Sequence, residues 1–201
     1  MILENKLGIT DQIALVKTEE KISKKKAKRL FDSGDIHHVA VGKFAGLSFI
    51  HAYLFEEIYG FAGQIREVNI AKSDFRFAPV MYLEASLKHI DAMPQSTFDE
   101  IIEKYVEMNV AHPFREGNGR ATRIWLDVML KIETRQVVDW NRVDKEEYLS
   151  AMQRSTVKDL EIKVLLKQAL TDQINNRTLF MKGIDVSYYF EGYSEFKTEE
   201  L

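Results

Sequence analysis

The sequence predicts an all-α protein with one small β-hairpin, and three observations lead to this fold class. Apolar residues recur at three- and four-residue steps along several long segments, which is the period of an amphipathic helix. One segment, residues 63–79, breaks that period and carries short extended runs instead. Only three prolines occur in 201 residues, so little interrupts the helices. A chain of this length is expected to form one domain, residues 1–201.

Four apolar stripes each predict a helix, and the stripes are expected to form the core. The first covers about 44–60, and the second begins at Phe98. The third covers about 118–133, and the fourth lies within 160–174. Each stripe keeps to one face at helical spacing, as core-facing helices do.

The exceptional segment, residues 63–79, is predicted to be a hairpin with a polar tip. Apolar residues alternate with polar ones on both sides of Lys72-Ser73-Asp74. This alternation is typical of two short strands joined by a turn. An irregular loop is the alternative that the residues alone leave open.

Composition excludes several classes of protein. The net charge is −3, which argues against a general nucleic-acid binder. The one cationic run, Lys21–Arg29, is expected to be a solvated helix face. No cysteine occurs, so disulfides and thiolate metal sites are excluded. Met1–Asp11 lacks an apolar signal core and no apolar run could span a bilayer, so we expect a cytoplasmic protein without a membrane partner.

Residues 112–123, His-Pro-Phe-Arg-Glu-Gly-Asn-Gly-Arg-Ala-Thr-Arg, form the most informative stretch. Pro113 disfavours the helical conformation at the residue before it, so the helix from Phe98 is expected to end near His112. Gly117-Asn118-Gly119 can turn sharply and direct backbone N–H groups at an anion. A helix expected to begin at about Asn118 adds its N-terminal dipole at the same point.

The polar side chains of this stretch are those needed to transfer a phosphorus group. Arg120 and Arg123 share one face of the expected helix and can grip phosphate oxygens. His112 can take a proton from an incoming hydroxyl. Glu116 is an oxygen ligand beside a phosphate loop, where Mg²⁺ is usually held. A zinc site is a poor alternative, because the five histidines (His37, His38, His51, His89 and His112) show no ligand spacing.

The pattern His112-x-Phe114-x-Glu116-Gly117-Asn118-Gly119-Arg120-x-x-Arg123 resembles the signature of the Fic family of AMP transferases at every position. The resemblance implies an all-α Fic fold, a helical bundle with a β-hairpin flap over the active site. It also implies transfer of AMP from ATP to a Ser, Thr or Tyr hydroxyl of a target protein, with pyrophosphate released. Kinase and phosphocholine-transferring branches exist, but the kinase branch usually has lysine where this chain has Gly119.

The resemblance also implies a role for each residue. His112 would be the catalytic base, and Glu116 would hold Mg²⁺, with Mn²⁺ or Ca²⁺ as alternatives. Gly117, Asn118 and Gly119 would cradle the phosphates, with Asn118 on the α-phosphate. Arg120 would contact the β-phosphate and Arg123 the γ-phosphate. Phe61-Ala62-Gly63-x-x-Arg66 resembles the lead-in to the flap, so Lys72 to Phe77 would hold an extended segment of the target beside the cleft. Lys72 is also expected among the nucleotide-binding residues.

A second signal lies near the C-terminus, where a short helix is expected at about 185–192. Asp185 can cap its start and Gly192 can end it in a left-handed conformation. By its residues alone this is an ordinary terminal helix. However, Ser187-x-x-x-Glu191-Gly192 resembles the inhibitory motif of the Fic subgroup with a C-terminal inhibitory helix, class III.

That second resemblance implies an autoinhibited enzyme. Glu191 would pair with Arg123 and so occupy the group meant for the γ-phosphate. Tyr188 and Tyr189 would be candidate sites of auto-AMPylation once the helix loosens, and a homo-oligomer is implied. Alternatives are a de-AMPylase working from the same site and a non-catalytic nucleotide-sensing protein, although an intact His112 disfavours the latter.

Overall fold

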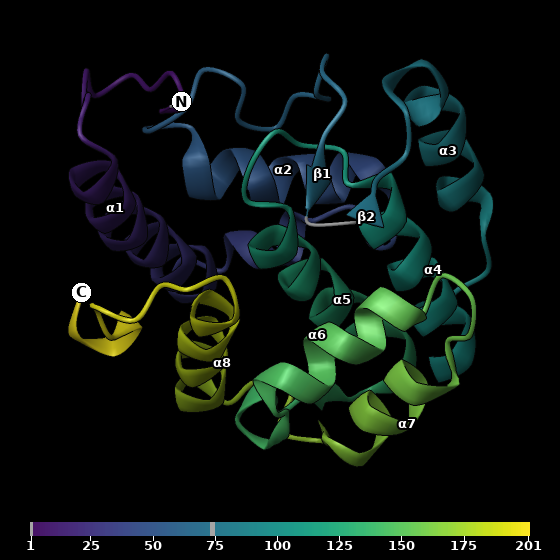
Figure 1. Ribbon diagram of the computed structural model, residues 1–201. Helices are drawn as coiled ribbons and strands as arrows, with labels where there is room; N and C mark the ends of the chain where they lie inside the picture. The colour runs from purple at the N-terminus through teal and green to yellow at the C-terminus, as the bar shows by residue number, and fades with distance from the viewer. Residues whose placement is uncertain (1, 73–74) are drawn as a thin grey trace.

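The structure of the protein is a computed structural model in which residues 2–72 and 75–201 are described. This part of the chain contains eight α-helices, and their arrangement is drawn in Figure 1. They are α1 (Gln12–Asp32), α2 (Phe44–Phe55), α3 (Val80–Ala92), α4 (Phe98–Ala111), α5 (Asn118–Thr134), α6 (Lys145–Arg154), α7 (Leu160–Gln168) and α8 (Arg177–Phe190). The prediction of an all-α fold is therefore confirmed.

Four short strands in the described residues form two antiparallel pairs. Strands β1 (Ala71–Lys72) and β2 (Phe75–Arg76) pair with Ala71 opposite Arg76. Strands β3 (Val137–Val138) and β4 (Leu170–Thr171) pair further along the chain. The predicted hairpin is present, but its strands occupy only the tip of residues 63–79, and residues 73 and 74 lie outside the described part.

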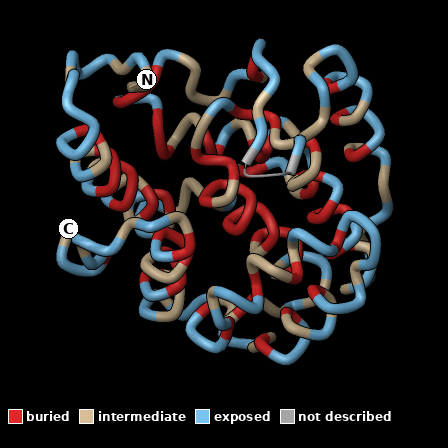
Figure 2. Tube along the Cα trace, viewed as in Figure 1, coloured by how far each residue is buried: buried red, intermediate tan, exposed pale blue. Residues whose placement is uncertain are grey.

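Helix α5 lies at the centre of the core and packs against α2, α4 and α8. Its buried residues lie on nearly all sides, including Trp125 and Leu126, which are fully buried. In Figure 2 the buried stretches gather on the inward faces of the helices. Because α5 starts directly after the 112–117 loop, this packing fixes the predicted site at the centre of the molecule.

The ends of α4 and α5 lie where the sequence predicted them. A capping box of Thr97 and Glu100 begins α4. The helix ends at Ala111, followed by His112 in a left-handed conformation with φ 49°. Helix α5 then begins after Gly117, whose φ of 79° is one that glycine adopts without strain.

Three predicted helix limits were wrong. Helix α2 ends at Phe55 rather than near residue 60, and turns follow, although Ile58 stays fully buried and so continues the apolar pattern. Helix α7 ends at Gln168 because the chain then enters β4. The terminal helix α8 begins at Arg177, one residue after its cap Asn176.

Asp185 therefore lies within α8 and is not its N-cap. Its carboxylate instead accepts hydrogen bonds from the backbone N–H (2.9 Å) and hydroxyl (2.6 Å) of Thr198. Thr198 begins a 3-10 turn in the tail that follows α8. The predicted end of the terminal helix is confirmed, since Gly192 has a φ of 93°.

The cationic run on α1 is not simply a solvated face. Lys21, Lys25 and Arg29 are exposed, but Lys24 is buried, with 1% of its side chain accessible. Its ammonium group lies 2.9 Å from Glu20 and 3.2 Å from Asp185, and it donates to the carbonyl of Phe196 at 2.5 Å. The prediction was wrong at Lys24, because this lysine joins α1 to α8 and to the tail. Helices α1 and α8 pack against each other (Figure 1). No described helix is both long enough and apolar enough to cross a bilayer.

Candidate active site

A cavity of about 580 Å³ lies beside the start of α5. Its walls come from the hairpin, the end of α4, the 112–120 loop and α6. This volume is within the range of roughly 300–1,000 Å³ that small-molecule sites occupy. The predicted site residues that line it are His112, Glu116, Gly117, Asn118, Gly119, Arg120, Arg123 and Glu191. The structure thus brings the two sequence signals, 79 positions apart at their extremes, to one cavity.

His112 is held at the cavity wall by the flap segment. Its ring stacks on that of Phe77, with centroids 3.6 Å apart and planes tilted by 16°. Its backbone has φ 49° and ψ 63°, a conformation that residues other than glycine adopt uncommonly and mostly at functional sites. The carbonyl of His112 accepts a hydrogen bond from Arg66 Nε at 2.8 Å. Both the ring and the backbone of the predicted base are therefore positioned.

Arg66 ties the base of the hairpin to the end of α4. It is 4% exposed and donates to the carbonyls of Val68 (2.8 Å), Ala78 (2.5 Å) and Ala111 (3.1 Å) in addition to His112. Burial lowers the pKa of this arginine. The sequence singled out Arg66 only as part of a flap lead-in, and the structure gives it a mechanical role.

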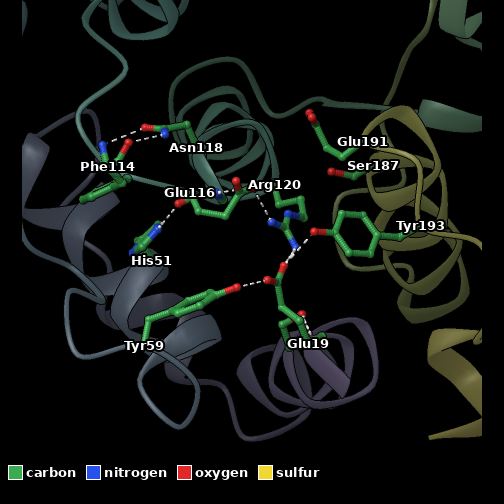
Figure 3. Close-up of polar contacts among 12 residues, drawn as sticks. Glu19, His51, Tyr59, Phe114, Glu116, Asn118, Arg120, Ser187, Glu191 and Tyr193 are labelled. Atoms are coloured by element: carbon green, nitrogen blue, oxygen red, sulfur yellow. Dashed lines mark hydrogen bonds and ion pairs between the residues drawn. The ribbon is translucent and has the colours of Figure 1, made fainter. Parts of the chain in front are cut away.

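Asn118 closes the loop that precedes α5. Its side-chain oxygen accepts from the backbone N–H of Phe114 at 2.9 Å, and its amide donates to the Phe114 carbonyl at 2.7 Å (Figure 3). Asn118 was expected on the α-phosphate, and in this structure its side chain is hydrogen-bonded to Phe114. A phosphate contact from this residue therefore falls to its backbone N–H, in the first turn of α5, where helices leave such groups without intrahelical partners.

His51, on α2, is a site residue that the sequence reasoning missed. It is fully buried and accepts a hydrogen bond from Gly63 N–H at Nδ1 (2.9 Å). Its Nε2 then carries the proton and donates to the Glu116 carbonyl at 2.7 Å. Burial lowers the pKa of His51 to about 4, so the ring is neutral. The only sequence signal was a polar residue on the apolar stripe of α2.

Arg123 is engaged by the terminal helix. Its Nε donates to Ser187 Oγ at 2.7 Å, and its Nη2 donates to the Ser187 carbonyl at 2.9 Å and to Glu191 Oε1 at 2.8 Å. Burial alone lowers the pKa of Arg123, but attraction to Tyr148 and Glu191 outweighs this and raises it. The predicted pair of Glu191 with Arg123 is present, and Ser187 adds two further contacts.

Arg120 lines the cavity but is already paired with two carboxylates. It is 1% exposed and lies between two carboxylates, those of Glu19 and of Glu116 at 3.0 Å (Figure 3). Its guanidinium also lies over the rings of Tyr188 (5.2 Å) and Tyr193 (4.5 Å). The β-phosphate contact implied by the resemblance would therefore compete with two existing ion pairs.

Glu19, on α1, is the second residue that sequence reasoning missed. Burial raises the pKa of this carboxylate, but Arg120 and the hydroxyls of Tyr59 and Tyr193 outweigh that effect and lower it. Glu19 is 101 positions away from Arg120. No local pattern on α1 distinguishes it from a solvated glutamate.

Glu116 is the candidate metal ligand, and its surroundings fit that role. Its side chain is 42% exposed and lines the cavity, and its Oε1 accepts from Gly117 N–H at 3.0 Å as well as from Arg120. Within residues 2–72 and 75–201 no group of three or more metal-binding side chains occurs. Mg²⁺ held by one carboxylate together with nucleotide phosphates needs no such group.

The remaining predicted residues differ in accessibility. Lys72 belongs to β1 by its backbone, and its side chain lies outside the described residues. Tyr188 is fully buried, and burial raises its pKa to about 12. Tyr189 is 52% exposed. In this conformation only Tyr189 of the two auto-modification candidates is accessible.

The chain is similar to known proteins over much of its length. The family model described as Fic/DOC matches residues 44–130, which include the loop, Arg120 and Arg123. The chain is 30% identical over 138 residues to "Probable protein adenylyltransferase Fic" of Salmonella typhimurium, covering 61% of this chain and 67% of the relative. It is 34% identical over 125 residues to the Escherichia coli protein of the same name, covering 55% and 60%. The chain belongs to the Fic/DOC family.

The relatives differ in length from this chain. "Protein adenylyltransferase VbhT" of Bartonella schoenbuchensis is 30% identical over 199 residues, which cover 92% of this chain but 40% of the relative. Among solved structures, the BepC protein of Bartonella tribocorum with bound AMPPNP superposes with a TM-score of 0.68 at 22% identity, covering 86% of this chain and 94% of the other. A Fic domain of Bartonella quintana with bound ADP has the same TM-score at 21% identity, covering 84% and 90%. These structures confirm the Fic fold.

Proposed function

We propose that the protein is an adenylyltransferase that moves AMP from ATP to a hydroxyl side chain of a target protein, in the cytoplasm. The observation that carries this proposal is the single cavity lined by His112, Glu116 and the loop before α5. Relatives named as protein adenylyltransferases, and a similar structure with bound AMPPNP, support the nucleotide and the reaction.

The geometry suits an in-line displacement at the α-phosphorus. The hydroxyl oxygen of the target forms the new bond to phosphorus while the bond to the β-phosphate oxygen breaks, and pyrophosphate leaves. His112 accepts the hydroxyl proton, and its ring is oriented for this by Phe77. The N-terminus of α5 faces the phosphates with its dipole. A bound Mg²⁺ on Glu116 would neutralise phosphate charge.

The target is proposed to present an extended segment at the hairpin. Within the described part of the chain, strands β1 and β2 pair only with each other, and they lie beside the cavity, which Ala71 and Phe77 line. Main-chain hydrogen bonds to such an edge hold a peptide without specifying its sequence. Lys72 is the proposed flap contact, and a homo-oligomer with Tyr189 as acceptor would permit auto-AMPylation.

We further propose that α8 is an inhibitory helix of the class III kind. Arg123 is the residue implied for the γ-phosphate, and here it is bound to Ser187 and Glu191. While Glu191 occupies it, ATP lacks that anchor, and the α-phosphate is not held in line with the hydroxyl. A buried pair is an effective latch, because removing one partner leaves the other charge uncompensated.

The function is tested by incubating the protein with labelled ATP and measuring the intact mass of the protein products. The parent, Glu191→Gly and His112→Ala are compared. An AMP adduct that increases with Glu191→Gly and disappears with His112→Ala supports the proposal. A phosphate adduct would instead assign the protein to the kinase branch. No adduct from any folded variant in the presence of ATP, divalent cation and candidate hydroxyl proteins contradicts it.

AMP removal is a second candidate function, and one observation favours it. Glu191 is a carboxylate that lines the same cavity as Glu116, so it can orient a water while Glu116 holds a metal. Incubation of AMP-modified protein with divalent cation would release AMP with the parent and not with Glu191→Ala. If the protein binds nucleotide but neither transfers nor removes AMP, the remaining alternative is a non-catalytic nucleotide-sensing protein.

A further inference from the structure

We propose that Glu19 on α1 is a positioning residue that sets how strongly Glu116 holds a divalent cation, acting through Arg120. This inference rests on the proposed nucleotide and metal site and concerns its regulation. It begins from a chain of contacts that runs from a helix outside the signature into the cavity: Glu19 to Arg120, and Arg120 to Glu116.

The first link is buried and directional. Glu19 is 2% exposed and accepts hydrogen bonds from three groups: Arg120 Nη1, the Tyr59 hydroxyl and the Tyr193 hydroxyl, the last at 2.9 Å. Tyr59 lies between α2 and the flap, and Tyr193 follows α8. Because these donors come from different parts of the chain, the ionised carboxylate is fixed in place (Figure 3).

The second link reaches the candidate metal ligand. Arg120 is 1% exposed, and its Nη2 lies 3.0 Å from Glu116 Oε1, four residues earlier in the sequence. Phe55, Tyr188 and Tyr193 enclose the guanidinium with their rings. Arg120 therefore has little room to move, and its charge acts on Glu116 from a fixed position.

Charge balance then decides how available Glu116 is. With Glu19 ionised, Arg120 is shared between two carboxylates, and Glu116 keeps negative charge for a metal. Without the charge of Glu19, the whole cationic charge of the buried Arg120 acts on Glu116, and water screens this pair only in part because the Glu116 side chain is 42% exposed. Arg120 would then pair more tightly with Glu116 and would repel an incoming divalent cation. Burial by itself disfavours ionised Glu19, so the charge is present only because of its partners.

The same chain offers a matched control. Glu20 is the next residue on α1, also 2% exposed, and it pairs with Lys24 at 2.9 Å rather than with Arg120. Glu20 also accepts from the backbone N–H groups of Glu195 and Phe196 in the tail. Glu19→Gln and Glu20→Gln therefore remove the same buried charge from the same helix, but only the first alters the neighbourhood of Glu116.

The test is a calorimetric titration of Mg²⁺, repeated with Mn²⁺, into each protein saturated with AMPPNP in the Glu191→Gly background. Metal-free AMPPNP affinity is measured alongside. Glu19→Gln is expected to weaken the metal about tenfold or more and to leave metal-free nucleotide affinity within about threefold. Glu19→Asp, which keeps the charge, is expected to recover most of the loss, and Glu20→Gln to lower the melting temperature without changing metal affinity.

The double variant Glu19→Gln/Arg120→Gln keeps the proposal testable if Glu19→Gln does not fold. It removes both charges, and its metal affinity is expected within about threefold of that of Arg120→Gln alone, because Glu19 acts on the metal only through Arg120. A double variant more than tenfold weaker than Arg120→Gln, or a folded Glu19→Gln with unchanged metal affinity, overturns the inference. A parent that binds no AMPPNP with or without metal overturns the proposed function as well, so the two failures are distinguishable.

Discussion

Gly119 lies directly against the carboxylate of Glu191. A Cβ at position 119 would stand 2.3 Å from Glu191 Oε1 and 3.1 Å from Arg123 Nη1. The resemblance distinguishes this position, because the kinase branch usually has a lysine there. The structure shows that, in this conformation, the carboxylate of Glu191 occupies the space beside Gly119. The same glycine therefore serves the proposed latch and the proposed nucleotide site.

We expect Gly119→Ala to destabilise the protein by about 1–3 kcal/mol, because the added methyl group must displace Glu191 from its hydrogen bond with Arg123. The cost should largely disappear in the Glu191→Ala background, giving a coupling free energy of about 1 kcal/mol or more. Urea unfolding of the four proteins measures it. Gly60→Ala is the control, since a Cβ there meets nothing within 4 Å. Additive effects of the two substitutions would contradict the packing relationship.

Ser187→Ala tests the part of the latch that the sequence did not describe. It removes the acceptor of Arg123 Nε but leaves the Ser187 carbonyl and Glu191 in place. We expect a loss of about 1–2 kcal/mol in the free energy of unfolding and a rise in AMP transfer smaller than that of Glu191→Gly. Labelled-ATP transfer and urea unfolding give the two readouts.

Ser150→Ala is the matched control for this prediction. Ser150 Oγ also accepts from an arginine, Arg154 at 2.5 Å, but at the surface of α6 and outside the cavity lining. It should change neither stability nor transfer appreciably, since exposed contacts contribute little. Equal effects of the two serine substitutions would mean that the Ser187 contact is not part of the latch.

His51 is expected to make the protein sensitive to acid. The unfolded state takes up a proton near pH 6.5, but the folded state does so only near pH 4. The unfolded state thus binds more protons between these values, so stability is complete above about pH 6.5 and is lost on acidification towards pH 4. The full difference amounts to roughly 3 kcal/mol. Urea unfolding from pH 4 to 7 measures it.

The comparison is between the parent and His51→Gln, with the exposed His89→Gln as control. Asp127 contributes an opposite slope, because burial raises the pKa of this carboxyl to about 7 and its ionisation on raising the pH favours unfolding. That contribution is common to all three proteins and cancels in the differences. If the stability difference between the parent and His51→Gln is the same at pH 4.5 and pH 7, the assignment of a lowered pKa to the buried His51 is wrong.

Contiguous signals made the 112–123 site predictable. Pro113 fixes the end of α4, Gly117 allows the turn into α5, and each effect acts within a few residues. The Ser187–Glu191 spacing places both residues on one helix face for the same reason. Contacts between distant segments were not predictable, apart from the Glu191–Arg123 pair that the resemblance implied. Nothing near Glu19 shows that Arg120 will meet it, and Asp185 has the local appearance of an N-cap although α8 begins eight residues earlier.

Lys24 makes buried contacts although it belongs to the charged run Lys21–Arg29. This lysine joins α1 to Asp185 of α8 and to the Phe196 carbonyl of the tail. Lys24→Met keeps the length of the side chain but leaves the buried carboxylate of Glu20 without its cation, which costs about 2–4 kcal/mol. Because the tail and α8 are then less firmly held, hydrogen exchange in residues 185–198 should accelerate more than in α4.

Lys25→Met, at an exposed position one residue away, should change neither stability nor hydrogen exchange. A Lys24→Met protein with parental stability and exchange would show that the lysine is a solvated residue after all. Faster hydrogen exchange in α8, accompanied by increased AMP transfer, would instead indicate that the contacts between α8 and α1 control the release of Arg123.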